Sequence, residues 1–300
     1  PFGEVVFSSY SPGVNLNYNV ELERKWLFSL KAGYNFNERR SFDVSNNLYD
    51  WFGEVIRVNN QPGEFGGAEN LITTSENIFA RQQLTYKLSE NQNLKLSIAP
   101  TVSIRTGDDL LIDGPFDPAL DKGRLFDMVI GLEHDITMFD ERLQNIAFVK
   151  NYNQNIRIET LDPSLGNILV DERAANNFGI GDGLRYKWSD RFTTKVSYEF
   201  AYRMPRLDEI FGDGQLILEN LALRPESSHN LNFQWTYNNK TIAKAEWQLE
   251  GNFFLRKIDD LILPLPLTVA ATNTQFFQNQ KVRSASSQGL VLAGKMNLNK

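Results

Sequence analysis

Residues 193–203 read TTKVSYEFAYR, and this stretch decides the fold class. Apolar side chains fall at every second position, at Val196, Tyr198, Phe200 and Tyr202, and mostly charged or polar residues lie between them. Successive side chains of a β-strand point to opposite faces, so a period of two predicts a strand with one apolar and one polar face. The stretch therefore favours a sheet that separates two environments.

The same alternation recurs along the chain. Residues 14–23, 79–88 and 230–238 repeat it, and we count about twelve such segments. Helical periodicity is nearly absent, and helix start signals occur only between the alternating segments. The sequence therefore predicts an all-β protein.

The connections between these segments alternate in length. Short polar turns are expected near 23–25, 89–93, 140–142, 189–191 and 238–240. Long connections rich in Gly, Pro, Asn and Asp are expected near 37–77, 106–123, 159–172, 204–227 and 259–286. Short periplasmic turns at one rim and long extracellular loops at the other are typical of an up-and-down outer-membrane barrel. A single alternating segment favours a soluble antiparallel sheet, but the whole set reverses that preference. We predict an antiparallel up-and-down transmembrane β-barrel, present as an incomplete sheet of about twelve strands.

Composition excludes several other classes. Hydrophobic residues make up 41% of the 300 residues and charged residues 23%, which is ordinary for a folded chain. The longest run without a charged or strongly polar residue, about 261–271, is far shorter than the roughly 20 residues of a membrane-spanning helix and contains two prolines. The net charge of −6 argues against nucleic acid as a partner. Aromatic residues near strand ends are interpreted as interfacial girdles, namely Trp26, Tyr152, Trp188, Tyr202 and Trp247.

The most distinctive motif lies at residues 202–233. It consists of YRMPRLDEIFG at 202–212 and LALRPESSHNLNF at 221–233. This stretch resembles the barrels of TonB-dependent outer-membrane receptors. The matching positions are Arg203, Met204, Pro205, Glu209, Phe211, Gly212, Leu223, Pro225, Glu226, Ser227 and Asn230. The resemblance is strongest over residues 178–298, and we expect residues 1–300 to be one partial barrel without a plug domain.

We interpret this motif as architecture. Proline cannot donate to a sheet ladder, so Pro205 is expected to end one strand and Pro225 to constrain entry into the next. Arg203 and Glu226 are expected to pair across the mouth of the hairpin and hold the base of the loop. Direct ligand contact by these two residues is the less favoured alternative.

Catalytic and metal chemistry is not indicated by the residue types present. The chain has no cysteine and two histidines, His134 and His229, on separate segments, so we expect no metal site. The acidic pairs at 108–109 and 259–260 are better interpreted as solvated turns than as calcium ligands. Residues 63–67, GEFGG, lack the lysine and helix of a phosphate loop. We expect no catalytic residues and no cofactor.

The resemblance implies an energy-coupled importer in the cell outer membrane of a Gram-negative-type bacterium. The implied partners are outer-membrane lipid, a TonB-type energy-coupling complex acting through the plug, and a small nutrient ligand. Ferric siderophore, haem, cobalamin and glycan are the implied cargo classes, bound by the five long loops named above. Two alternatives remain open: a passive porin or adhesin-type barrel, and an outer-membrane enzyme.

Overall fold

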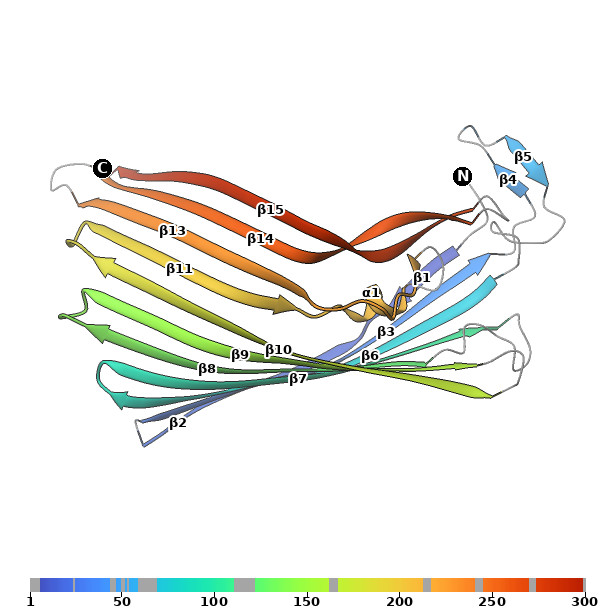
Figure 1. Cartoon of the computed structure of the whole chain (residues 1–300), viewed down its shortest axis with the longest axis horizontal. Helices are drawn as coiled ribbons and strands as arrows, with labels where there is room; N and C mark the ends of the chain where they lie inside the picture. Colours follow the sequence, from blue (N-terminus) through green and yellow to red (C-terminus); the bar gives the residue numbers. More distant parts are fainter. Residues whose placement is uncertain are drawn as a thin grey trace.

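One curved antiparallel sheet makes up nearly all of the molecule (Figure 1). The computed structural model describes residues 6–23, 25–43, 47–49, 52, 54–58, 69–110, 122–161, 167–212, 217–240, 245–269 and 274–298. Within these ranges the sheet has 13 strands, against about twelve predicted from alternation. The predicted all-β, up-and-down, incomplete barrel is confirmed.

The strands follow the sequence order around the sheet. They are β1 (Val6–Tyr10), β2 (Gly13–Leu22), β3 (Trp26–Asp43), β6 (Glu69–Ser89), β7 (Gln92–Asp109), β8 (Lys122–Met138), β9 (Leu143–Leu161), β10 (Ile168–Lys187), β11 (Phe192–Arg203), β13 (Glu226–Lys240), β14 (Ala245–Val269) and β15 (Thr274–Leu298). The short β12 (Ile217–Leu218) pairs with β15 in parallel, and every other pairing in the sheet is antiparallel. A separate hairpin consists of β4 (Asn47–Tyr49) and β5 (Val55–Val58), and the described helix is α1 (Leu207–Phe211).

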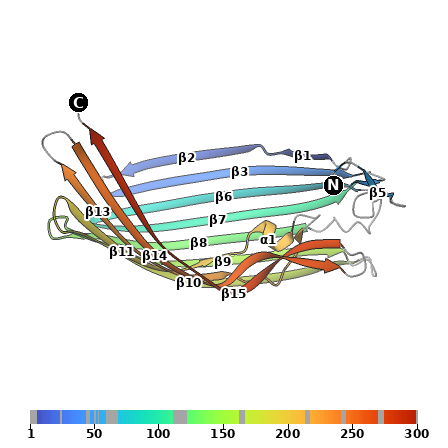
Figure 2. The same ribbon diagram turned by 90° about the horizontal axis from the view of Figure 1, so that it is seen from above.

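The sheet curves into a trough, and the strands are connected at its two ends, which we call rims (Figures 1 and 2). Four of the predicted short turns, near residues 23, 90, 140 and 190, lie together at one rim. The fifth, expected at 238–240, is shifted, because β13 continues to Lys240 and the turn itself lies outside the described residues. The long connections leave from the opposite rim.

The two faces of the sheet differ in polarity as the alternation predicted. Val196 and Phe233 lie directly opposite each other on the convex face and are 43% and 40% exposed. Their sequence neighbours Lys195 and Gln234 form the next pair, on the concave face. A sheet with an apolar outer face and a polar inner face is suited to a wall between lipid and an aqueous lumen.

Pairs of aromatic rings in contact lie on the convex face near the short-turn rim. Ring centroids are 4.2, 4.7 and 5.3 Å apart in the pairs Trp26–Tyr86, Tyr186–Trp188 and Tyr237–Trp247. These positions agree with an interfacial girdle for three of the five predicted residues. Tyr152 is a correction, because it points to the concave face and is only 8% exposed. Tyr202 lies at the far end of β11.

Several strands extend into segments predicted as loops. Much of 259–286 is strand, because β14 continues to Val269 and β15 begins at Thr274. Asp259 and Asp260 are therefore strand residues with lysine partners, not turn residues. The N–H of Ile262 points away from β15 and donates to a side chain of β13. Pro264 and Pro266, which suggested a loop, lie two and four residues further along β14, so their nitrogen atoms face the same side of the strand. Proline is tolerated at such an unpaired edge because no ladder bond is lost.

Other loop expectations are only partly described. β3, β6, β7, β8, β9 and β10 run into the predicted loops at 37–77, 106–123 and 159–172 and shorten them. Residues 63–67 and the side chain of Asp109 lie outside the described part of the chain.

Aromatic rings cover glycines on directly opposite strands. Phe148 lies over Gly181 on the concave face, and Trp235 lies over Gly251 on the convex face. A Cβ atom at either glycine would lie 2.2 Å from the ring. Glycine at these positions lets a large ring lie flat against the backbone, which stabilises the pairing of long strands.

Candidate functional site

The connection between β11 and β13 folds back onto the concave face of the sheet. We call residues 204–225 the strap. The described part of the strap contains α1 and β12, and α1 lies inside the trough beside β8 and β9 (Figures 1 and 2). A connection predicted as an open extracellular loop is therefore in contact with the barrel wall.

Local sequence explains how the strap turns inward. Pro205, which is fully buried, ends β11 because it has no N–H to donate. The backbone N–H of Arg206 then donates to the Glu209 carboxylate at 2.9 Å, which closes the first turn of α1. Gly212 ends the helix with φ at 64°, a conformation that glycine adopts without strain.

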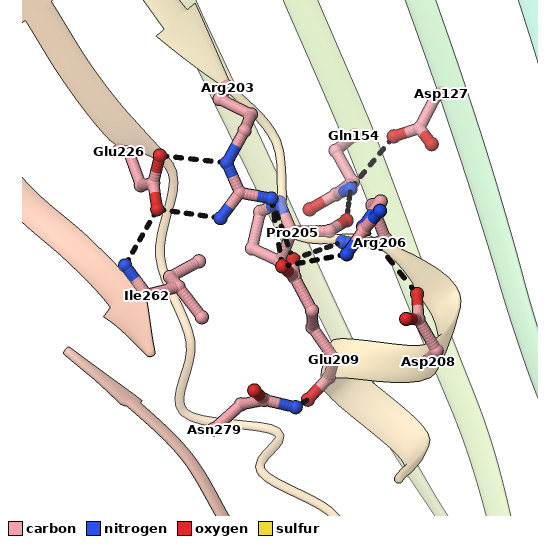
Figure 3. A network of polar contacts seen from close by, with 10 residues as sticks. All are labelled: Asp127, Gln154, Arg203, Pro205, Arg206, Asp208, Glu209, Glu226, Ile262 and Asn279. Atoms are coloured by element: carbon pink, nitrogen blue, oxygen red, sulfur yellow. Dashed lines mark hydrogen bonds and ion pairs between the residues drawn. The ribbon is translucent and has the colours of Figure 1, made fainter. Parts of the chain in front are cut away.

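Arg203 connects the two ends of the strap (Figure 3). Its guanidinium donates to both oxygens of Glu226, with Nε to Oε2 at 2.7 Å and Nη2 to Oε1 at 2.6 Å. Its Nη1 donates to both oxygens of Glu209 at 2.8 and 2.9 Å. The expected pair between Arg203 and Glu226 is present, and Glu209 makes it a clamp of one cation and two carboxylates.

The surroundings of the clamp shift the pKa values of Arg203 and Glu226. Arg203 is the twelfth residue of β11 from the short-turn rim, and Glu226 is the fifteenth of β13. Both lie beyond the 9–11 residues that a strand needs to cross a bilayer. The hydrogen bonds that Arg203 donates to Glu226 raise the pKa of Arg203 above its usual value. Burial works to raise the pKa of Glu226, but the bonds from Arg203 and the N–H of Ile262 outweigh it and lower that pKa.

The barrel wall also holds the backbone of the strap. Gln154, which is 1% exposed, donates to the carbonyl of Pro205 at 2.9 Å and to Asp127 at 2.8 Å (Figure 3). Arg105 donates to the carbonyls of Phe211 and Gly212. Arg173 and Asn279 likewise donate to the carbonyls of Leu221 and Glu209. In the opposite direction, Asn220 of the strap donates to the backbone carbonyl of Asn279. Donors from four strands, β7, β9, β10 and β15, thus fix the path of one connection.

Apolar packing completes the attachment of α1. Ile210 is fully buried and packs with Leu125 of β8 and Ile156 of β9. The ring of Phe211 lies against Gly123, where a Cβ atom would lie 2.7 Å from it. Burying an isoleucine side chain contributes about 1.5–3 kcal/mol, so the strap is held by packing as well as by polar bonds.

Not all the predicted motif residues belong to this cluster. Arg203, Pro205, Glu209, Phe211 and Gly212 do, together with Glu226. Leu223 is buried at 5%, and Pro225 directly precedes β13. Ser227 lies opposite Tyr202 on the convex face, and Asn230 lies opposite Glu199 lower on the concave face. Met204 precedes Pro205 and is partly exposed.

Gln154, Arg105 and Asn279 contact the strap directly, and Asp127 accepts a hydrogen bond from Gln154. None of these four residues was predicted. Polar residues on the inner face of a strand carry no local signal that selects one of them. Asp127 is the twelfth residue of β8 from the short-turn rim, and burial raises its pKa above the usual value.

The arrangement supports a structural role better than a chemical one. The Arg203 clamp uses its donors on carboxylates, and it contains no nucleophile with an adjacent base. Within the ranges that the structure describes, no three His, Cys, Asp or Glu side chains gather to hold a metal ion. No helix among the described residues is long and apolar enough to cross a membrane.

Comparisons with known proteins agree with this geometry. The TonB dependent receptor-like β-barrel family matches residues 6–299. No match is found among curated proteins. Three similar solved structures are a copper transporter, OprC, an iron transporter of Neisseria meningitidis, FrpB, and a hemophore receptor of Serratia marcescens, HasR.

The structural likeness is broad but covers only part of each relative. OprC is 14% identical with a TM-score of 0.66, and the match covers 96% of this chain and 44% of that one. FrpB is 13% identical with a TM-score of 0.67 and coverage of 96% and 42%, and HasR is 11% identical with a TM-score of 0.66 and coverage of 98% and 47%. The chain spans less than half the length of each. The matched family consists of receptors, which confirms the expectation that the protein is not an enzyme. The chain belongs to the TonB-dependent receptor-like β-barrel family.

Proposed function

We propose that this chain is part of the barrel wall of an outer-membrane receptor that imports a scarce nutrient. The observation that carries the proposal is a two-faced wall whose motif-bearing strap is folded onto the inner, polar face. Such a wall separates lipid from a passage. The strap narrows the passage from one side while staying fixed to it.

The cargo we favour is a metal ion or metal chelate. The similar solved structures include a copper transporter, iron transporters, a hemophore receptor and a siderophore receptor of Acinetobacter baumannii, PiuA. Ferric siderophore and haem therefore rank above cobalamin and glycan. Contact with the cargo is assigned to the loops near 37–77, 106–123 and 159–172, to the β14–β15 ribbon within 259–286, and to the exposed side of the strap within 204–227.

Energy coupling is assigned to a TonB-type complex acting through a plug domain, and all 300 residues to one barrel unit. The test is uptake of radiolabelled ferric siderophores, haem and cobalamin by cells with and without the intact protein. We expect uptake of one cargo that stops when an uncoupler removes the proton gradient. Uptake that continues after uncoupling would instead identify a passive porin-type barrel.

The location in the outer membrane has its own test. Leu231 is on the convex face of β13, and the next residue, Asn232, is on the concave face. Arginine on a lipid-facing position costs up to about 2–4 kcal/mol, with the largest cost at the bilayer midplane, whereas a lumen position tolerates it. We expect Leu231→Arg to lower the yield of folded, membrane-inserted protein several-fold and Asn232→Arg to leave it unchanged. Equal effects of the two variants would contradict the assignment of the faces.

A further inference from the structure

A row of polar side chains crosses the apolar convex face. Strand register places His134 opposite Ala147, Ala147 opposite Asp182, and Asp182 opposite Tyr198. These residues lie on β8, β9, β10 and β11, so the row crosses four neighbouring strands. The hydroxyl of Tyr198 lies 2.8 Å from Nδ1 of His229 on β13, which extends the row to a fifth strand. Both histidines of the chain are thus on this face.

Asp182 is the acidic centre of the row. Asn145 donates to its Oδ1 at 2.6 Å and also contacts the carbonyl of Gly183 at 3.4 Å. The amide nitrogen of Asn145 is thereby used within the chain. The exposed carboxylate of Asp182 therefore keeps acceptor positions that a hydrogen-bond donor of another molecule can reach.

This row is surrounded by an apolar surface. Five flanking residues are 41–54% exposed, namely Leu132, Val149, Ile180, Leu184 and Val196. Asp182 lies four positions along β10 from Tyr186 of the aromatic girdle. With a rise of about 3.3 Å per residue and a tilt of about 40°, its depth is roughly 10 Å in a band about 25 Å tall. Ionisable residues at such depths in lipid are costly and usually pair with another group.

We propose that this face is a lateral docking surface for a second copy of the same protein. The argument is charge complementarity, because one face presents both a carboxylate and imidazoles. Two copies inserted in the same direction are related by a two-fold axis along the membrane normal, so each contact between two residues across the interface occurs twice. An axis near Ala147 brings His134 of each copy toward Asp182 of its partner.

The size and tilt of the strands are compatible with this pairing. His134 and Asp182 are two strands apart, about 9.6 Å, and a 40° tilt separates them in height by roughly 6 Å. The combined reach of a histidine and an aspartate side chain spans that offset. Ala147 between them is small, and small residues let two membrane proteins approach closely.

The test uses the absence of cysteine from the chain. Ala147→Cys introduces one thiol at the proposed axis, and Ile98→Cys introduces one on the convex face of β7 as a matched control. Oxidative cross-linking of the intact protein in isolated outer membranes is expected to give a species of twice its mass for Ala147→Cys and none for Ile98→Cys. Only monomer, or a product with another protein's mass, would overturn the proposal.

Side-chain variants test whether the polar row causes the association. In the Ala147→Cys background, Asp182→Leu is expected to lower the cross-linked fraction at least fivefold. The exchange of His134→Asp with Asp182→His is expected to restore it, and an unchanged fraction in Asp182→Leu would contradict the mechanism. This inference rests on the proposed membrane location. Absence from the outer-membrane fraction would sink that location, whereas membrane-inserted monomer would sink only the dimer.

Discussion

Replacing Arg203 by methionine removes the cation of the clamp while keeping a long side chain. The side chains of Glu226 and Glu209, only 5% and 9% exposed, then lose their shared partner. Breaking a buried ion pair costs about 3–5 kcal/mol, but the Arg203 side chain is 38% exposed and solvent screening reduces the value. We therefore expect the strap to lose about 2–3 kcal/mol of local stability, a change of roughly 30- to 150-fold in its open population.

Hydrogen exchange read by mass spectrometry measures this population directly. The N–H groups of Glu209 and Ile210 bond to the carbonyl of Arg206, and the N–H of Asn220 bonds to the carbonyl of Ile210. Their exchange should accelerate by the stated factor while strand amides of β9 stay protected. Arg206→Met is the control, because its 69% exposed side chain should matter by less than fivefold. Exchange in Arg203→Met within threefold of the parent protein would refute the reasoning.

Three more outcomes follow from the same contacts. Gly123→Leu should displace the phenylalanine ring of α1 and raise strap exchange at least tenfold, since a Cβ there lies 2.7 Å from that ring. Gly181→Ala should lower the free energy of unfolding by about 1–3 kcal/mol, because the added Cβ atom collides with the Phe148 ring. Gly183→Ala should leave it unchanged, because the atom nearest to its added Cβ lies 3.8 Å away, and equal melting temperatures of the two variants would contradict this prediction. The pKa of Glu226 is lower in the folded protein than its ordinary value, so the stabilisation of the strap by Glu226 should be complete above the ordinary pKa. It should be lost as the pH falls through the lowered pKa, and hydrogen exchange of the strap amides measured across acidic pH checks this.

The architecture was predictable from sequence because each strand carries its own two-faced pattern. Val196, Tyr198 and Phe200 alternate without interruption, so the convex face of β11 was assigned before any pairing was known. The pair of Arg203 and Glu226 was also predictable, because these residues flank a single hairpin.

The rest of the site depends on contacts that no local pattern encodes. Gln154 reaches the carbonyl of Pro205 across 51 residues of sequence, and Asn279 reaches that of Glu209 across 70. These contacts exist only because the strap folds inward, and loop composition does not specify that path. Reading proline and asparagine as loop residues also underestimated the lengths of β14 and β15.

The pairing of β14 with β13 ends at Asp259, opposite Ser227, whereas its pairing with β15 continues to Val269. Beyond Asp259, the edge of β14 that faces away from β15 is therefore not paired with a strand. Such an edge normally offers a backbone donor at every second residue and can recruit a foreign strand. Here the Ile262 N–H is occupied by Glu226, and Pro264 and Pro266 have none to offer. These three residues, which lie nearest the barrel, therefore offer no free N–H donor along this edge. The ribbon of β14 and β15 therefore lacks, over this stretch, the donors through which an edge strand recruits a foreign strand.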